Sequence, residues 1–119
     1  MRMIRFVYKA VQYGMVIWKA RIYTLKFKFL LNINGLNYGN GLRCYNATPV
    51  LQINRNSGVV SFGKNVMFNS YTDHSWNSKC KLIVLANATL TIGDDSGMNG
   101  AMIYCSQKVL IGNHVKIGG

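Results

Sequence analysis

A four-residue pattern that returns at long intervals constrains this chain more than any other feature. The sequence I-G-D-D at residues 92–95 returns as I-G-N-H at residues 111–114, 19 residues later. A weaker copy, F-G-K-N, stands at residues 62–65, 30 residues before Ile92. A recurring hexapeptide is typical of a parallel β-helix, in which three hexads make one triangular coil of about 18 residues. The spacing therefore predicts a mostly β solenoid.

Each part of the repeat has a physical role in such a fold. The apolar residue of each copy should point inward and stack on its equivalents in the neighbouring coils, so we expect Phe62, Ile92 and Ile111 in one interior column. The glycine and the small polar pair suit the corners, where β-branched residues fit poorly. Residues 38–40 supply a degenerate copy. We expect short strands at 81–85, 88–92 and 109–111.

The intervals between the copies also predict an insertion and an incomplete solenoid. The 30-residue interval exceeds one coil by roughly 12 residues, and the polar, aromatic segment 71–79 is the best place for the surplus. Inserted corner loops often shape binding sites. We expect a partial solenoid domain over residues 32–119, truncated before its C-terminal coils, because no capping segment follows residues 111–114.

Residues 1–31 form a second region, a basic amphipathic arm. Apolar residues recur every three or four positions, which predicts a helix to about residue 25–30 followed by extended chain. These are Ile4, Val7, Val11, Met15, Trp18, Ile22, Leu25 and Phe29. The arm carries seven of the 14 basic residues and no acidic residue, in a chain of net charge +11. The apolar stripe either packs on the solenoid or on a neighbouring arm, or it contacts an anionic membrane surface. Nucleic acid is not expected as a partner, because the aromatic residues lie among aliphatic ones.

The cysteines and histidines offer little chemistry by themselves. Cys44, Cys80 and Cys105 have neither disulfide-framework nor zinc spacing, so we expect reduced thiols in a cytoplasmic protein and no metal. Cys105 is expected to be a small buried thiol. His114 takes the second polar position of a corner and is expected to be an exposed turn residue.

The segment L-T-I-G-D-D-S-G-M-N-G…V-L-I-G-N-H-V-K-I-G-G resembles the hexapeptide-repeat acyltransferases. Within them it is most similar to the O-acetyltransferases of surface polysaccharides and sugars. The likeness is specific over residues 59–119 and extends more weakly over 32–58. It implies a left-handed parallel β-helix, a homotrimer, acetyl-CoA as donor and a saccharide hydroxyl as acceptor. Over the helix the resemblance is only architectural, since such enzymes often begin with a helical arm. If the arm contacts a membrane, a cytoplasmic enzyme would lie at its inner face.

In that family a histidine shortly after the I-G-N-x-V-x-I-G corner acts as the general base, and the resemblance places it beyond Gly119. The coils that bind the pantetheine of CoA are expected there too, so the 119 residues alone should be inactive. The resemblance aligns Asn99 with an asparagine that faces the acceptor sugar; alternatively, Asn99 is a corner residue that forms an internal ladder. His74 and Trp76, in the inserted segment, could contact a sugar ring or lie on plain surface.

Three alternatives remain open at this stage. The chain could be a non-catalytic β-solenoid module for structure or interaction. It could also be a relative of the serine O-acetyltransferases or of the sugar N-acyltransferases, which share the coil and differ in their acceptor pockets.

Overall fold

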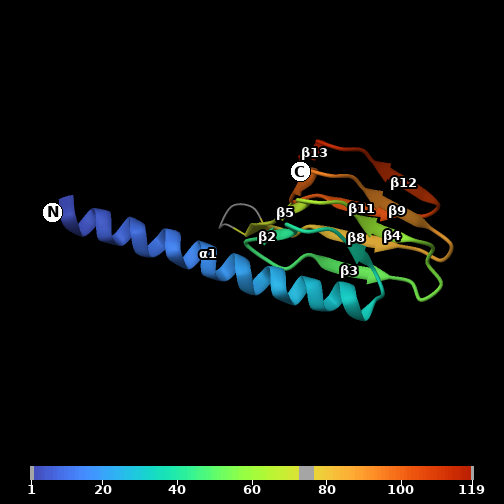
Figure 1. Cartoon of the computed structure of the whole chain (residues 1–119), viewed down its shortest axis with the longest axis horizontal. Coiled ribbons are helices and arrows are strands. Elements are labelled where there is room, and N and C mark those ends of the chain that lie inside the picture. The colour runs from blue at the N-terminus through green and yellow to red at the C-terminus, as the bar shows by residue number, and fades with distance from the viewer. Residues whose placement is uncertain (1, 73–76, 119) are drawn as a thin grey trace.

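The fold consists of one long N-terminal helix followed by short strands, most of them parallel. A computed structural model describes residues 2–72 and 77–118 of the chain (Figure 1). Helix α1 spans Arg2–Ile33. The strands are β1 (Asn37–Tyr38), β2 (Arg43–Tyr45), β3 (Val50–Ile53), β4 (Val60–Phe62), β5 (Met67–Asn69), β6 (Tyr71–Thr72), β7 (Asn77–Ser78), β8 (Lys81–Val84), β9 (Thr89–Ile92), β10 (Gly97–Asn99), β11 (Met102–Cys105), β12 (Lys108–Ile111) and β13 (Lys116–Ile117).

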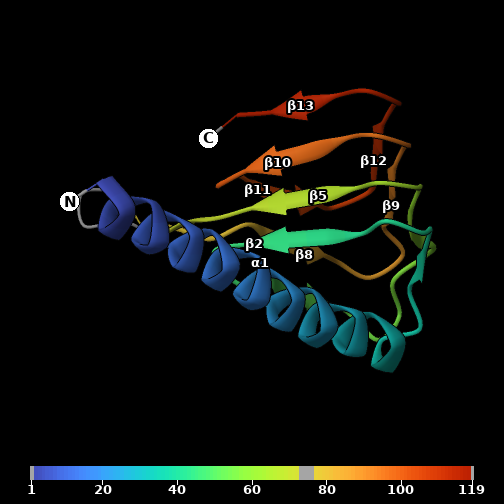
Figure 2. The same cartoon turned by 60° about the vertical axis from the view of Figure 1, so that its left-hand side comes forward.

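Three parallel sheets, which we call the three-sheet body, share all the strands except β6 and β7. Their strand orders are β1-β4-β9-β12, β13-β10-β5-β2 and β11-β8-β3. Consecutive strands enter different sheets, so each pass along three strands adds one strand to every sheet. Figure 2 shows β2, β5, β10 and β13 one above another, with α1 lying below β2. The sequence repeat is thus a repeat of layers.

The predicted column of apolar residues is confirmed by the strand register. Phe62 pairs with Ile92, and Ile92 pairs with Ile111. Tyr38, from the degenerate copy, pairs with Phe62 and extends the column by one layer. Phe62 and Ile92 are buried, and Ile111 packs against the same core. Stacking of equivalent side chains therefore selects an apolar residue at this position in every layer.

The glycine and the polar residues of the repeat serve two different needs. A Cβ on Gly93 would lie 2.6 Å from the carbonyl carbon of Gly112, so the glycine is required by the close approach of the next layer. The left-handed backbone falls two residues later, with φ of 56° at Asn65, 57° at Asp95 and 58° at His114. Asn, Asp and His tolerate this region better than most residues. We expected backbone angles to explain both positions, and they explain only the second.

The surplus in the middle of the chain is a small insertion, as predicted for residues 71–79. Strands β6 and β7 pair antiparallel, with Tyr71 opposite Ser78 and Thr72 opposite Asn77. They leave the body after β5 and return to it before β8. The strands expected at 81–85, 88–92 and 109–111 appear as β8, β9 and β12, each within one residue of its expected end.

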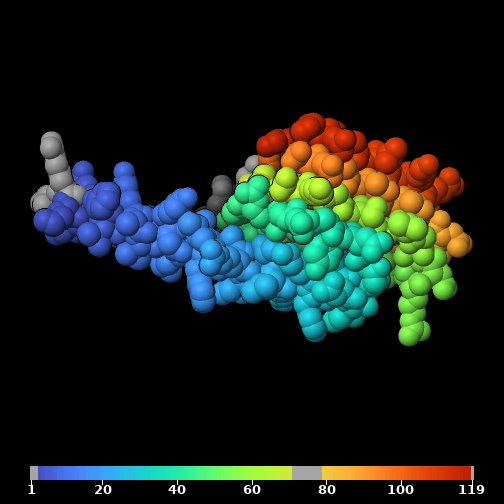
Figure 3. All heavy atoms as spheres, in the orientation of Figure 1, coloured from blue at the N-terminus to red at the C-terminus, as the bar shows by residue number. Residues whose placement is uncertain are grey.

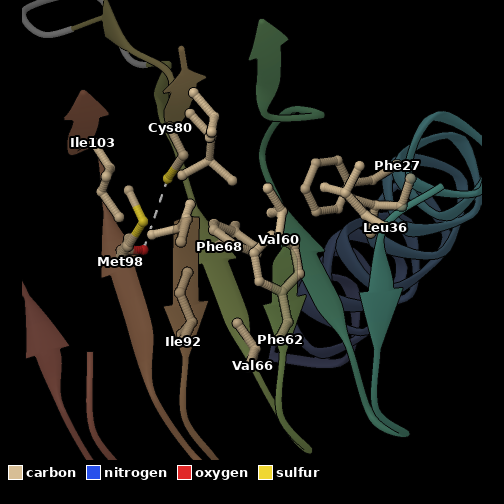
Figure 4. Close-up of a cluster of buried hydrophobic side chains, with 14 of the residues drawn as sticks. Phe27, Leu36, Val60, Phe62, Val66, Phe68, Cys80, Ile92, Met98 and Ile103 are labelled. Atoms are coloured by element: carbon tan, nitrogen blue, oxygen red, sulfur yellow. Dashed lines mark hydrogen bonds between the residues drawn. The ribbon is translucent and has the colours of Figure 1, made fainter. Parts of the chain in front are cut away.

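Helix α1 ends later than predicted, because its last turns belong to the core. Phe27 and Leu31, one helical turn apart, are both completely buried. The aromatic rings of Phe27 and Phe68 meet edge to face with centroids 5.2 Å apart, and Phe62 stands 5.6 Å from Phe68 (Figure 4). The strand-like alternation after Leu25 is therefore not used, and the expectation of extended chain from residue 25–30 is wrong.

A glycine cap terminates α1 immediately before the body. Leu36 N–H donates to the Leu31 carbonyl at 2.9 Å, and Gly35 N–H donates to the Asn32 carbonyl at 3.2 Å. Gly35 has a φ of 71°. This is the hydrogen-bond pattern of a Schellman motif, and its usual hydrophobic contact is made by Leu31 and Leu36, both in the core. The helix thereby ends four residues before β1. Among the described residues no helix has the length and apolar character of a membrane span.

Candidate functional site

Asn99 lies on the outer face of the sheet formed by β2, β5, β10 and β13. Its neighbour Met98 is only 2% exposed and points into the core, so strand alternation turns Asn99 outward, where it is half-buried. Asn99 pairs with Asn69 of β5, and Asn69 pairs with Tyr45 of β2. The three residues form one row across the layers.

One asparagine of this row receives a side-chain hydrogen bond from a residue beside the row. The Asn46 side-chain amide donates to Asn69 Oδ1 at 2.8 Å, which ties the first two layers together. Among the hydrogen bonds within the described part of the chain, none involves the Asn99 carboxamide. The bond between Asn46 and Asn69 does not continue to Asn99 within the described residues, so both roles considered for Asn99 stay predictions. A carboxamide can both donate to and accept from hydroxyl groups.

A groove of about 380 Å³ crosses the same face of the sheet. One register row, with Arg43, Met67, Gly97 and Lys116 in successive layers, lines it. Gly97 contributes no side chain, and a Cβ there would lie 2.8 Å from the Met67 carbonyl oxygen. Asn65, Asp95 and Ser96 complete the lining. Asn99, two residues after Gly97 on β10, faces the same side.

The polar pairs of the repeat hold the layers together at the corner next to this groove. Asp94 accepts a hydrogen bond from Lys64 N–H at 2.8 Å, and Asn113 accepts one from Asp94 N–H at 2.7 Å. The Asn65 amide donates to Asp95 Oδ1 at 3.1 Å, and His114 Nδ1 lies 3.7 Å from Asp95 Oδ2. The side chain of His114 is 77% exposed. As predicted, His114 is an exposed turn residue.

His74 and Trp76, the other two predicted contacts to the acceptor, lie outside the described residues. The insertion that contains them begins directly beside the asparagine row. Ser70, which follows Asn69, is completely buried, and its hydroxyl accepts a hydrogen bond from Cys80 N–H at 3.0 Å. This bond joins the two ends of the insertion, and it fixes the base of the insertion next to Asn69.

The three cysteines are free and buried, and they belong to the core rather than to the site. Cys80 Sγ donates to the Asn69 carbonyl at 3.4 Å, and Cys105 Sγ donates to the Thr89 carbonyl at 3.3 Å. The buried position predicted for Cys105 is confirmed. Burial raises the pKa of Cys44 to about 12, with a further contribution from Cys80. A thiol of this kind stays protonated and is a poor nucleophile. Within the described residues no cluster of His, Cys, Asp and Glu side chains could hold a metal ion.

The sequence analysis did not predict the groove, although one residue in the sequence indicates it. In the segment G-M-N at 97–99 the glycine takes a position that alternation turns outward, where it leaves a gap between larger neighbours. The gap becomes visible only when the register places Gly97 between Met67 and Lys116.

Comparison with known proteins adds no assignment: no family model, no curated protein and no solved structure matches this chain.

Proposed function

We propose that the three-sheet body is a left-handed parallel β-helix of the hexapeptide-repeat type and that it serves a CoA-dependent acyltransferase. The reaction would transfer acetyl from acetyl-CoA to a saccharide hydroxyl, in the cytoplasm and within a homotrimer, as the sequence resemblance implies. The single observation that carries the proposal is the register of the repeat. Phe62, Ile92 and Ile111 pair in consecutive layers, each followed by a glycine and a polar pair.

The outer face of β10 supplies the acceptor-binding part of this function. A saccharide presents hydroxyl groups that both donate and accept hydrogen bonds, and the Asn99 carboxamide matches them. The adjacent groove has polar groups at its border, including Arg43, Asp95 and Lys116. His74 and Trp76 remain predicted contacts from the insertion.

The chemistry requires a general base that the described residues do not place beside Asn99. An imidazole would take the proton of the acceptor hydroxyl, the oxygen would attack the thioester carbonyl, and the thiol of CoA would leave. The resemblance assigns this role to a histidine after the corner at 111–114, and none of residues 115–118 is a histidine. For these 119 residues we therefore expect saccharide binding without acetyl transfer.

A non-catalytic binding module is the second candidate. His114 and Asp95 serve as corner residues. The described lining of the groove therefore offers an amide and charged groups but no imidazole, which favours binding without catalysis. Serine O-acetyltransferases and sugar N-acyltransferases would differ in the acceptor, so adding serine and amino sugars to the binding experiment separates them.

Saccharide binding is measured by NMR titration of the isotope-labelled chain with a panel of neutral and acidic sugars. We expect shifts of the Gly97–Asn99 amides, and we expect Asn99→Ala to weaken binding about tenfold, as for one lost hydrogen bond. Asn37→Ala, at an exposed position on β1, is the matched control and should bind as the original chain does. If no sugar shifts these amides, the acceptor site is wrongly placed.

Acetyl transfer is measured by release of the CoA thiol in the presence of a bound sugar. We expect no release by these 119 residues, because the described lining of the groove contains no imidazole. Release by the 119 residues would contradict the placement of the base, and a His74→Ala variant would then show whether His74 supplies it.

A further inference from the structure

Helix α1 presents a continuous apolar surface that the body does not cover. We call it the outer stripe: Ile4, Val7, Val11, Met15, Trp18, Ile22, Leu25 and Phe29. Every member is exposed, from 48% at Ile22 to 74% at Ile4. Figure 3 shows the N-terminal part of α1 extending beyond the body as a free arm. An uncovered apolar surface of this length marks an interaction site.

The side of the helix that packs against the body shows which way the outer stripe faces. Phe27 and Leu31 are buried against the body. Thr24 Oγ1 accepts a hydrogen bond from Cys44 N–H at 2.9 Å, and the Tyr23 carbonyl accepts one from Thr48 Oγ1 at 3.2 Å. At about 100° per residue, the side that carries Thr24, Phe27 and Leu31 lies opposite Ile22 and Phe29. The outer stripe therefore faces away from the body along the whole helix.

Positive charge borders the outer stripe on both sides. By the same helical geometry, Lys19 and Lys26 follow one edge, and Arg21 and Lys28 lie toward the other. The arm carries seven basic and no acidic residues. Long basic side chains beside an apolar stripe can reach lipid headgroups while the stripe enters the acyl boundary.

A groove between α1 and β2 continues this charged border toward the body. Its volume is about 410 Å³, and Ile17, Leu25 and Leu42 are among its apolar lining residues. Arg21, Lys28 and Arg43 surround it, and none of its described lining residues is acidic. Leu25 belongs both to the groove and to the outer stripe. The groove thus brings three cations to one edge of the apolar surface, as an anionic headgroup requires.

We propose that the outer stripe binds an anionic lipid membrane, with α1 lying along the surface between the bilayer and the body. A second copy of the arm is the competing occupant. It would bring seven positive charges close to another seven, with no acidic residue on either arm to offset them. An anionic bilayer satisfies the apolar stripe and the charge together.

Binding is measured with vesicles of phosphatidylglycerol and phosphatidylcholine in equal parts, and with pure phosphatidylcholine. Co-sedimentation gives the affinity, and the emission of Trp18, in a Trp76→Phe background, reports its environment. We expect binding at least tenfold stronger to the anionic vesicles, with a shift of Trp18 emission to the blue. Equal binding to both vesicles would overturn the electrostatic part of the proposal.

Two variants with matched controls distinguish binding through the outer stripe from nonspecific adsorption to vesicles. Combined Ile22→Asn, Leu25→Asn and Phe29→Asn substitutions should weaken binding to anionic vesicles at least tenfold. Three similarly exposed residues of the body, changed by Val59→Asn, Tyr104→Asn and Leu110→Asn, should leave binding within twofold. Likewise, Lys19→Gln with Lys26→Gln should weaken binding several-fold more than Lys64→Gln with Lys108→Gln, which removes the same charge from the body.

Circular dichroism verifies that each variant keeps the helix and strand content of the original chain. Unchanged vesicle binding by a folded stripe variant would overturn the proposal. So would sedimentation in lipid-free solution showing that the original chain self-associates and that the stripe variant does not, because the stripe would then be covered by a second copy.

Discussion

The two regions of this chain use apolar residues in opposite ways. In the body, burial alternates along strands such as β8, where Leu82 and Val84 are buried while Lys81 and Ile83 are half-buried. In the first half of α1, every described residue from Met3 to Lys19 is exposed, including Phe6 and Trp18. Most apolar residues of the body are thus buried or half-buried, whereas those in the first half of the arm are exposed. Only the last turns of α1 therefore contribute side chains to the buried core.

The largest expected contrast compares two phenylalanines of one helix. Phe27→Ala removes a completely buried ring from the cluster with Phe62 and Phe68 and should cost about 3–5 kcal/mol of unfolding free energy. Phe29→Ala, at a position 64% exposed, should change it by less than about 0.5 kcal/mol. Urea unfolding measures both. Similar losses for the two variants would mean that the packing side of α1 is misassigned.

A smaller effect is expected within the body, at the glycine of the repeat. Gly93→Ala places a methyl group 2.6 Å from backbone atoms of Gly112 and should destabilise the fold by about 1–3 kcal/mol. Gly112→Ala is the matched control, because the same position one layer later has no atom within 4 Å. Thermal unfolding of the two variants tests the close stacking of layers, which equal stabilities would refute.

The smallest expected effect is a pH dependence that arises from Cys44. Its pKa rises from 9.0 to about 12 in the folded state, so between these values the unfolded chain loses the proton and the folded chain keeps it. Below about pH 9 both states keep the proton, and the thiol does not make the unfolding free energy depend on pH. Above pH 9 the unfolding free energy falls as the pH rises toward 12, and by pH 10 it has fallen by about 1.4 kcal/mol.

The Cys44→Ala variant isolates this contribution, because the other groups that titrate above pH 9 are common to both proteins. The difference in unfolding free energy between the original chain and the variant should shrink from pH 8 to pH 10. A difference that stays constant would show that the Cys44 thiol is not desolvated in the folded state.

Much of the body could be predicted because the spacing of the repeat determines which residues stack in neighbouring layers. The column of Phe62, Ile92 and Ile111 follows from the spacing of the copies, and the insertion after β5 follows from the one interval that is too long. The separate roles of Gly93 and Asp95 did not follow, since the proximity of the next layer to a glycine depends on three-dimensional stacking.

The orientation of the arm and the groove could not be predicted in the same way. Both sides of α1 are apolar near its end, so Leu25 and Phe29 compete with Phe27 and Leu31 for the body, and only tertiary packing decides between them. The packing excludes one alternative left open by the sequence, namely that the stripe covers the solenoid of its own chain. The groove at Gly97 depends on residues from four layers. Of the predicted site residues, Asn99 lies on a strand face, which the sequence analysis did not predict, while His74 and Trp76 lie outside the described residues.

The most direct test of the layered repeat is an NMR measurement of contacts between the backbones of residues 62, 92 and 111. Parallel strands lie about 4.8 Å apart, so nuclear Overhauser effects should join the segments at Phe62 and Ile92, and those at Ile92 and Ile111. Their presence in both pairs is the predicted result. Their absence in a folded sample would contradict the stacked register and, with it, the proposed acyltransferase fold.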